Sequence, residues 1–352
     1  MIKSRYHVLG VMSGTSLDGI DIAYITFDYN SKWTFKIHAS ETISYSEYWL
    51  EKLTNLVAID LQTLQQIDKA YTIYLAEIIS NFIQKYQLSE IDAICSHGHT
   101  AWHKPEDNFT YQIGNLPELA RLTGHLVVCD FRTQDVSLKG QGAPLVPIGD
   151  QLLFSDYDYC INLGGFANIS SESNGNRIAY DICPVNIVMN RYAKKLGYEY
   201  DRGGEIARSG VVDSGLLETL NRLRFYAVNP PKSLGLEWVE THVFPVLEHS
   251  KLSEQIILRT VVEHIAIQIT KTIKPNSKAF FTGGGSYNHF LLERIKAHKV
   301  FDLIVPSKEI IEFKEALIFG LLGVLKLRGE VNCLASVTGA IKDHSSGVQF
   351  YP

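Results

Sequence analysis

Three glycine-containing segments carry the residue types that bind phosphate. Small residues let backbone N–H groups approach phosphate oxygens, and neighbouring hydroxyls add further donors. Each segment follows a short apolar run with strand character: residues 14–19 (GTSLDG), 162–168 (NLGGFAN) and 282–286 (TGGGS). The third also precedes a predicted helix, whose N-terminus favours an anion. Any one of them is more often a structural turn, and Asp18-Gly19 equally suits a plain hairpin. Together they predict a nucleotide-binding protein, although no lysine follows the glycines as in a P-loop.

Asp181 is a candidate general base. It ends a predicted strand (RIAYD) and precedes Cys183-Pro184-Val185-Asn186 at the start of a helix. A carboxylate at this position can take a proton from water or from a hydroxyl. It can equally be a helix-start group that accepts backbone N–H bonds, and Asn186 can be a cap or a ligand. In the first glycine segment, Asp18 can hold the water shell of a magnesium ion.

Two further polar segments are candidates for substrate contacts. Residues 96–100 (SHGHT) are predicted to form a loop after a strand over Ile91–Cys95, and their histidines lack the partners of a zinc site. Residues 130–135 (DFRTQD) follow another strand, where Arg132 can bind a carboxylate through two parallel hydrogen bonds or pair with a neighbouring aspartate. Glu315 lies in the first turn of an apolar helix, where its charge also complements the helix dipole.

The elements that position these segments alternate between strands and helices, which predicts an α/β fold. The pattern of strand, small-residue loop and strand near the start recurs from residue 159, so we expect two similar halves with a nucleotide cleft between them. The glycine- and proline-rich stretch Lys139–Pro147 is the predicted boundary. We expect one domain over residues 1–138, a second over 139–327, and a segment 328–352 that packs back on the first.

Composition excludes several classes of protein. The chain has 352 residues, 45% of them hydrophobic and 20% charged, which fits a globular protein of two domains. A formal net charge of −5 argues against a protein built to hold nucleic acid, although a local pocket can still bind a small anion. Five cysteines without C-x-x-C spacing argue against a disulfide framework or a structural zinc site. With neither a secretion signal nor a long apolar run, we expect a cytoplasmic protein without a membrane span.

Seven motifs, taken in order, resemble those of the anhydro-N-acetylmuramic acid kinases. They are VMSGTSLDGID (11–21), SHGHT (96–100), DFRTQDV (130–136), GQGAPLVPIGD (140–150), NLGGFANIS (162–170), TGGG (282–285) and KEALIFG (314–320). The likeness covers nearly the whole chain. It implies the two-domain, ATP-dependent fold of the actin, hexokinase and Hsp70 class, with duplicated, ribonuclease H-like mixed sheets around a nucleotide cleft.

The resemblance implies an unusual reaction. ATP, water and 1,6-anhydro-N-acetylmuramic acid give N-acetylmuramic acid 6-phosphate and ADP, in the recycling of peptidoglycan sugars of the cell wall. Asp181 would be the base that activates water for attack on the anomeric carbon, and the released O6 would take the γ-phosphoryl group. ATP and Mg²⁺ are the implied cofactors, and a homodimer is the family expectation.

The resemblance also implies roles for individual residues. The ATP phosphate loop would be Gly14, Thr15, Ser16, Leu17, Asp18, Gly19, Ile20 and Asp21. Further nucleotide contacts would come from Asn162, Gly164, Gly165, Asn168, Gly283, Gly284 and Gly285. The sugar side would comprise Thr100, Asp130, Arg132, Asn186 and Glu315. A site for phosphoryl transfer is expected to have many backbone hydrogen-bond donors and few catalytic side chains.

One motif departs from the family pattern. Many members read Asp-Thr-Gly-Pro-Gly-Asn around the base, whereas residues 181–186 read Asp-Ile-Cys-Pro-Val-Asn. Replacing glycine removes room and conformational freedom, so local sugar contacts can differ. Two alternatives stay open: a kinase of the same fold for another sugar or anhydro-sugar, and a nucleotide-gated, actin- or Hsp70-like protein that is not a kinase. Asp181 and the polar sugar-side segments have no clear purpose in the latter.

Overall fold

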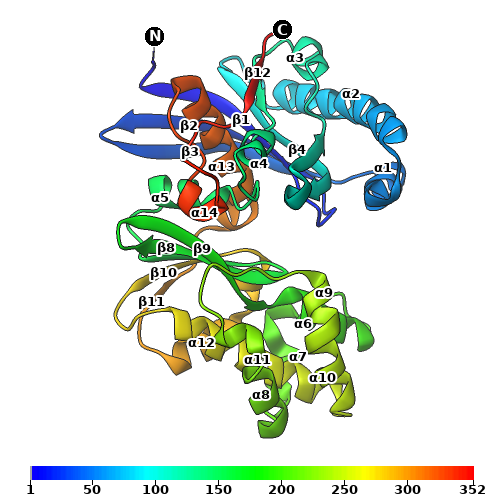
Figure 1. Ribbon diagram of the computed structural model, residues 1–352, viewed down its shortest axis with the longest axis vertical. Coiled ribbons are helices and arrows are strands. Elements are labelled where there is room, and N and C mark those ends of the chain that lie inside the picture. Colours follow the sequence, from blue (N-terminus) through cyan, green and yellow to red (C-terminus); the bar gives the residue numbers. More distant parts are fainter. Residues whose placement is uncertain (1) are drawn as a thin grey trace. The chain divides into compact units, whose positions relative to one another are not determined.

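The computed structural model describes residues 2–352, and these form two compact units. One unit comprises the chain up to Leu153 together with Phe313–Pro352, and the other is Phe154–Glu312 (Figure 1). The two boundaries lie after Leu153 and before Phe313, whereas the predicted boundaries lie after residues 138 and 327. The glycine- and proline-rich stretch stays with the first unit because the Gly142 N–H donates to Asp135 Oδ2 at 2.7 Å.

The first unit is built on a seven-stranded mixed sheet. Its strands are β1 (Arg5–Ser13), β2 (Ile20–Asn30), β3 (Lys32–Ile43), β4 (Ala93–Lys104), β5 (Phe109–Ile113), β6 (Val127–Cys129) and β12 (Val348–Phe350). They follow the order β12-β6-β4-β1-β2-β3, with β5 paired to β4. Strands β1, β2 and β3 form an antiparallel meander, and β1, β4 and β6 pair in parallel.

The second unit repeats this arrangement in a five-stranded sheet. Its strands are β7 (Tyr159–Leu163), β8 (Phe166–Ser173), β9 (Asn176–Pro184), β10 (Lys278–Thr282) and β11 (Asp302–Ile304), in the order β11-β10-β7-β8-β9. Here β7, β8 and β9 are the antiparallel meander, while β7, β10 and β11 pair in parallel. The same topology in both sheets confirms the predicted α/β fold with duplicated mixed sheets.

Helices cover both faces of the first sheet. On one face, α1 (Glu47–Thr54), α2 (Leu61–Lys85) and α3 (Glu118–Thr123) enclose an apolar core. Helices α1 and α2 are separate, because the Asp60 side chain accepts a hydrogen bond from the Thr63 N–H and begins a new helix at Leu61. The remaining helices are α4 (Thr133–Ser137), α5 (Val146–Leu153), α14 (Ala335–Thr338) and the 3₁₀ turns Leu56–Ala58 and Pro105–Asp107.

In the second unit, α6, α11 and α12 lie along one face of the sheet (Figure 1). The helices are α6 (Asn186–Lys195), α7 (Glu205–Ser209), α8 (Ser214–Asn221), α9 (Leu236–Trp238), α10 (Phe244–His249), α11 (Glu254–Thr272) and α12 (His289–His298). Short 3₁₀ segments span Arg202–Gly204, Arg224–Ala227 and Gly284–Tyr287, and a π-helical turn spans Val239–Val243. Within residues 2–352, no helix combines the length and the apolar character needed to cross a membrane.

The prediction that the strand before SHGHT ends at Cys95 is wrong. Strand β4 continues to Lys104, so this motif lies within the strand. The continuation is stabilised by β5, whose Ile113 and Gln112 pair with His99 and Thr100. Gly98, at φ 73°, sits where the pairing of β4 with β1 changes register. A left-handed residue of this kind lets a strand pass through an irregularity without ending.

Helix α13 (Lys308–Arg328) packs unusually close to the first sheet from Phe313 onward. A Cβ at Gly10 of β1 would overlap the carbonyl of Ala316, and a Cβ at Gly323 would overlap Cys95. Gly320 likewise lies against Ile25 of β2. Glycines on both sides of the contact therefore determine how close the helix lies to the sheet. The helix begins at Lys308, so the prediction that Glu315 lies in its first turn is wrong.

We predict that Gly323→Ala lowers the free energy of unfolding by about 1–3 kcal/mol, because the added methyl group overpacks a fully buried contact with Cys95. Thermal and urea unfolding measure the loss. Gly215→Ala in α8 is the matched control, since its Cβ would lie 3.5 Å from the nearest atom. That variant should be neutral or gain up to about 1 kcal/mol. Equal stability of the two variants would contradict the close packing of α13.

Candidate functional site

Four polar side chains lie in one row across adjacent strands of the second sheet. Asn162 of β7 pairs with Thr282 of β10 on one side and with Asn168 of β8 on the other. Asn168 in turn pairs with Asp181 of β9. Directly paired residues project from the same face of a sheet. The structure therefore places Asn162, Asn168 and Asp181 side by side, together with Thr282 from a distant part of the sequence.

A bulge in β9 sets the orientation of Asp181. Asn168 pairs with Asp181 and Ala167 with Cys183, so Ile182 is the extra residue of the strand. Bulges of this kind redirect a side chain and are frequent beside active sites. Ile182 and Cys183 both turn into the core of the second unit, whereas Asp181 is half-buried.

The residues that depart from the family pattern are buried. Ile182 is 3% exposed, and Cys183 and Val185 are fully buried among the core residues of the second unit. Their larger side chains fill the core under the turn. The divergent residues therefore belong to the internal packing, whereas Asp181 and Asn186 are half-buried.

A segment that the sequence analysis did not identify holds the carboxylate of Asp181. The Asp181 N–H donates to the Lys232 carbonyl at 3.1 Å, and the Leu234 N–H donates to Asp181 Oδ2 at 2.8 Å. Burial raises the pKa of Asp181 above its usual range, and the hydrogen bond from Leu234 opposes this shift. No sequence signal marks Leu234, because the contact uses its backbone.

The second and third glycine segments pack against each other. Gly283 has φ 80°, and a Cβ on it would collide with the Asn162 side chain and the Leu163 backbone. The Asn186 amide donates to the Leu163 carbonyl at 3.1 Å. The N–H groups of Val185 and Ile187 donate to Gly165, and that of Asn186 to Gly164. The Gly164 and Gly165 carbonyls thus accept hydrogen bonds from the N–H groups at the start of α6. The Asn186 side chain stabilises the turn between β7 and β8.

The first glycine segment is the loop of the β1–β2 hairpin in the other unit. Leu17, at φ 62°, donates its N–H to the Gly14 carbonyl at 3.3 Å and closes a turn. Thr15, Ser16 and Asp18 are exposed on this loop, whereas Gly19 and Ile20 are buried. Asp21 accepts a hydrogen bond from Thr42 at 2.5 Å. The loop presents hydroxyls and one carboxylate to solvent.

Arg132 is the centre of the predicted sugar-side residues in the first unit. Its Nε donates to His97 Nε2 at 2.9 Å, and its Nη1 donates to the Gly142 carbonyl at 2.6 Å. Its hydrogen-bond partners are therefore His97 and Gly142, and not Asp130 or Asp135 as in the alternative prediction. Burial lowers the pKa of Arg132 to about 10, and the charge of Glu315 acts in the opposite direction. Nη2 and one hydrogen of Nη1 remain for a ligand.

Of the other predicted sugar-side residues, Asp130, Thr100 and Glu315 belong to the same unit as Arg132, whereas Asn186 belongs to the other unit. Asp130, at φ 55°, accepts from the Thr133 hydroxyl at 2.6 Å and starts the turn into α4. Thr100 lies on β4, three residues beyond His97. Desolvation raises the pKa of Glu315, whereas the charges of Arg132 and Lys314 lower it. Glu315, Arg132 and His97 thus form one group of the first unit.

A buried hydroxyl network under the first glycine loop was missed from the sequence. Ser13 Oγ lies 2.5 Å from the Tyr45 hydroxyl and 2.8 Å from His99 Nδ1, and it accepts from the Tyr71 hydroxyl at 2.9 Å. The network ties the end of β1 to the SHGHT motif and to α2. Its members come from β1, α2, β4 and the connection between β3 and α1, so no local spacing indicates it.

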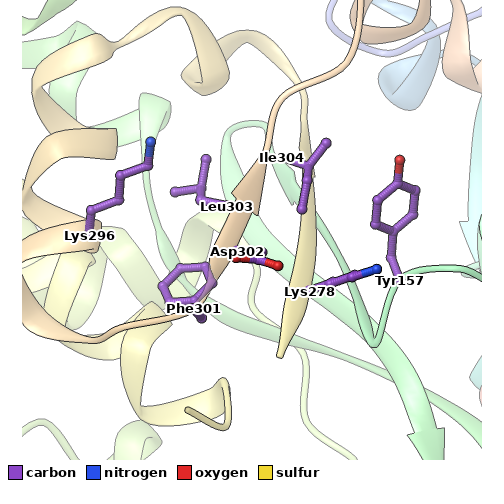
Figure 2. A pocket seen from close by; sticks show the side chains of 7 residues that line it. All are labelled: Tyr157, Lys278, Lys296, Phe301, Asp302, Leu303 and Ile304. Atoms are coloured by element: carbon purple, nitrogen blue, oxygen red, sulfur yellow. The ribbon is translucent and has the colours of Figure 1, made fainter. Parts of the chain in front are cut away.

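A pocket of about 620 Å³ opens elsewhere on the second unit, beside the edge strand β11. Figure 2 shows its lining: Tyr157, Lys278, Lys296, Phe301, Asp302, Leu303 and Ile304. None of the predicted site residues lines it. The pocket is therefore not part of the candidate site.

Comparison with known proteins gives a consistent result. A sequence model described as anhydro-N-acetylmuramic acid kinase matches residues 6–352. The kinase of that name from Mannheimia succiniciproducens is 35% identical, covering 99% of this chain and 100% of its own. The one from Saccharophagus degradans is 33% identical, covering 98% of both. A solved activator of 2-hydroxyisocaproyl-CoA dehydratase from Clostridium difficile matches with a TM-score of 0.45 at 14% identity, over 92% of this chain and 96% of its own.

We predict that His99 makes the protein less stable in acid. Burial lowers its pKa to about 4, against about 6.5 in an unfolded chain. Between these values the unfolded state binds more protons, so the free energy of unfolding falls as the pH drops from 7. At pH 5 the loss due to His99 is about 2 kcal/mol. Urea unfolding across this range should show that His99→Asn removes this part of the pH dependence.

The control for this measurement is His249→Asn, because His249 is exposed. Its pH dependence should match that of the unmodified chain. An identical pH dependence for His99→Asn would show that His99 is not held neutral by burial.

Proposed function

Because the chain belongs to the anhydro-N-acetylmuramic acid kinase family, we propose that it phosphorylates 1,6-anhydro-N-acetylmuramic acid with ATP and opens the anhydro ring with water. The products are N-acetylmuramic acid 6-phosphate and ADP, and the role is the recycling of cell-wall sugars. The observation that carries the proposal within this chain is the position of Asp181. It is a half-buried carboxylate, held by a backbone N–H, in a row of polar side chains.

Asp181 is the proposed general base. One oxygen, Oδ2, accepts from the Leu234 N–H at 2.8 Å, which fixes the carboxylate and leaves Oδ1 to accept a proton from water. The water oxygen bonds to the anomeric carbon as the bond from that carbon to O6 breaks. O6 then bonds to the γ-phosphorus of ATP, and ADP leaves. The raised pKa of Asp181 makes it a better base than an exposed aspartate.

Two sets of residues are proposed to bind ATP. The loop from Gly14 to Asp21 offers exposed hydroxyls and small residues for phosphate oxygens. Asn162, Asn168 and the Gly283–Gly285 turn offer amide and backbone groups for the rest of the nucleotide. The exposed Asp18 carboxylate fits the water shell of Mg²⁺, a hard ion that prefers oxygen ligands. Bound Mg²⁺ would supply charge neutralisation on the transferring phosphoryl group.

Arg132 is proposed to bind the carboxylate of the sugar substrate. Two of its nitrogens are fixed by His97 and Gly142, so the guanidinium is oriented before a ligand arrives. Preorganised donors of this kind lose little freedom on binding. Thr100, Asp130, Asn186 and Glu315 are the further proposed sugar contacts. We also propose a cytoplasmic location, where ATP is supplied, and a homodimer, which light scattering tests.

We predict that Asp181→Asn lowers kcat by about 10²–10⁴-fold, the usual contribution of general base catalysis, with nearly unchanged ATP binding. An amide keeps the hydrogen bond from Leu234 but cannot accept the proton of water. An ADP-release assay with the anhydro-sugar measures turnover, and calorimetry measures ATP affinity. Asp156→Asn, on an exposed site of the same unit, should keep full activity. Near-normal turnover of Asp181→Asn would refute the assignment of the base.

A panel of acceptors tests the substrate itself. We expect ADP release with 1,6-anhydro-N-acetylmuramic acid and at least about tenfold less with N-acetylmuramic acid, N-acetylglucosamine or glucose, because only the first has a ring to open. A preference for another sugar would show that the protein is a kinase with a different substrate from the proposed one. No ADP release with any acceptor would favour a nucleotide-gated protein of this fold.

A further inference from the structure

Three side chains of metal-binding type meet in the interior of the first unit: Asp135, Cys333 and His344. Asp135 belongs to α4, whereas Cys333 and His344 belong to the C-terminal segment, about 200 residues later in the chain. They are 0%, 1% and 6% exposed. None of the three has a role in the kinase reaction proposed above, and the inference does not depend on that reaction.

Backbone pairing holds the cysteine and the histidine side by side. Cys333 and His344 form an antiparallel bridge in which each N–H donates to the other's carbonyl at 3.1 Å. Residues paired in this way project to the same side. Both side chains reach the same oxygen, Asp135 Oδ1, with Cys333 Sγ at 3.1 Å and His344 Nε2 at 3.6 Å.

The hydrogen bonds of His344 involve only one of its two ring nitrogens. Its Nδ1 lies 3.2 Å from the Lys342 carbonyl, which can only accept, so Nδ1 carries the hydrogen. In the neutral ring, the lone pair of Nε2 then faces a carboxylate oxygen. Nε2 is buried and has no hydrogen-bond partner among the described residues. Buried polar atoms are seldom left in this state, so a positive charge at this point would stabilise the cluster.

The distances suit a tetrahedral ion. Zinc binds thiolate sulfur at about 2.3 Å and nitrogen or oxygen at about 2.0–2.2 Å, which places neighbouring ligand atoms about 3.4–3.6 Å apart. The observed 3.1 Å and 3.6 Å bracket this range. The contact from Nδ1 to a backbone carbonyl is also the usual outer support of a metal-bound histidine. The Thr338 hydroxyl, 2.7 Å from Asp135 Oδ1, lies close enough to contact a water in the fourth position.

We propose that Asp135, Cys333 and His344 bind a zinc-class divalent ion that braces the C-terminal segment against α4. The thiol hydrogen, now donated to Asp135 Oδ1, leaves when the ion binds. The other oxygen, Oδ2, keeps its hydrogen bond from the Gly142 N–H at 2.7 Å. Because the Gly142 carbonyl accepts from Arg132, the ion would also stiffen the loop that orients this arginine. Burial raises the pKa of the Cys333 thiol, so an ion is needed to make it a thiolate.

Cobalt(II) titration of the chelator-treated, full-length protein tests the site. We expect a thiolate-to-cobalt charge-transfer band and the intense visible bands of tetrahedral cobalt, saturating at about one ion per chain. Zinc should displace the cobalt and raise the melting temperature. Cys333→Ser should abolish the charge-transfer band, and His344→Gln should weaken binding at least about tenfold. Cys160→Ala removes a buried cysteine of the other unit and should keep the band.

The unmodified protein decides the question even if a variant folds poorly. Absence of the charge-transfer band in its cobalt titration would overturn the proposal. A band that survives in Cys333→Ser would place the ion at another cysteine and would overturn it equally. A band lost only in the variants of this cluster supports it.

Discussion

The antiparallel pairing of β7, β8 and β9 sets Asn162, Asn168 and Asp181 opposite one another, and the proposed chemistry rests on this register. Successive residues of a strand face opposite sides, so a slip by one residue would turn Asp181 towards the apolar core. An unpaired carboxylate in that core would be strongly destabilising. The bulge at Ile182 and the hydrogen bond from Leu234 keep the carboxylate on the polar side.

Side chains of the first unit are positioned by packing and by hydrogen bonds. The close packing of α13 through glycines determines where Glu315 lies, and a series of hydrogen bonds orients Arg132. Asp135 holds Gly142, and Gly142 holds Arg132, whose Nε is held by His97. Each contact uses a group that would otherwise be a buried polar atom without a partner. Candidate ligand-binding side chains are thereby positioned by residues that do not themselves face a ligand.

The sequence predicted those parts of the molecule that depend on local pattern. Strand β7 begins at Tyr159, where the pattern was predicted to recur, and the repeated strand-loop-strand pattern matches the common topology of the two sheets. The continuation of β4 through SHGHT could not be predicted, because β5 supplies the stabilising partner. The boundaries between the two units differ from the predicted ones for two reasons. Asp135 holds the glycine- and proline-rich stretch in the first unit through Gly142, and α13 belongs to that unit from Phe313 onward.

Long-range contacts account for what the sequence could not show of the candidate site. Leu234 acts through its backbone N–H, so its side chain gives no signal. Ser13, Tyr45, Tyr71 and His99 form one network from separate elements. Asp135, Cys333 and His344 come from distant segments and meet only in the folded chain, so the spacing of the cysteines could not indicate this cluster.

The most direct test of the central claim, that water activated by Asp181 opens the anhydro ring, is turnover in ¹⁸O-labelled water. Mass spectrometry of the sugar phosphate locates the label. The account predicts one ¹⁸O atom at the anomeric hydroxyl, with the phosphoryl group unlabelled, in product quenched before anomeric exchange. A phosphorylated sugar without label at that carbon would contradict it, because the ring would then have opened without attack by water.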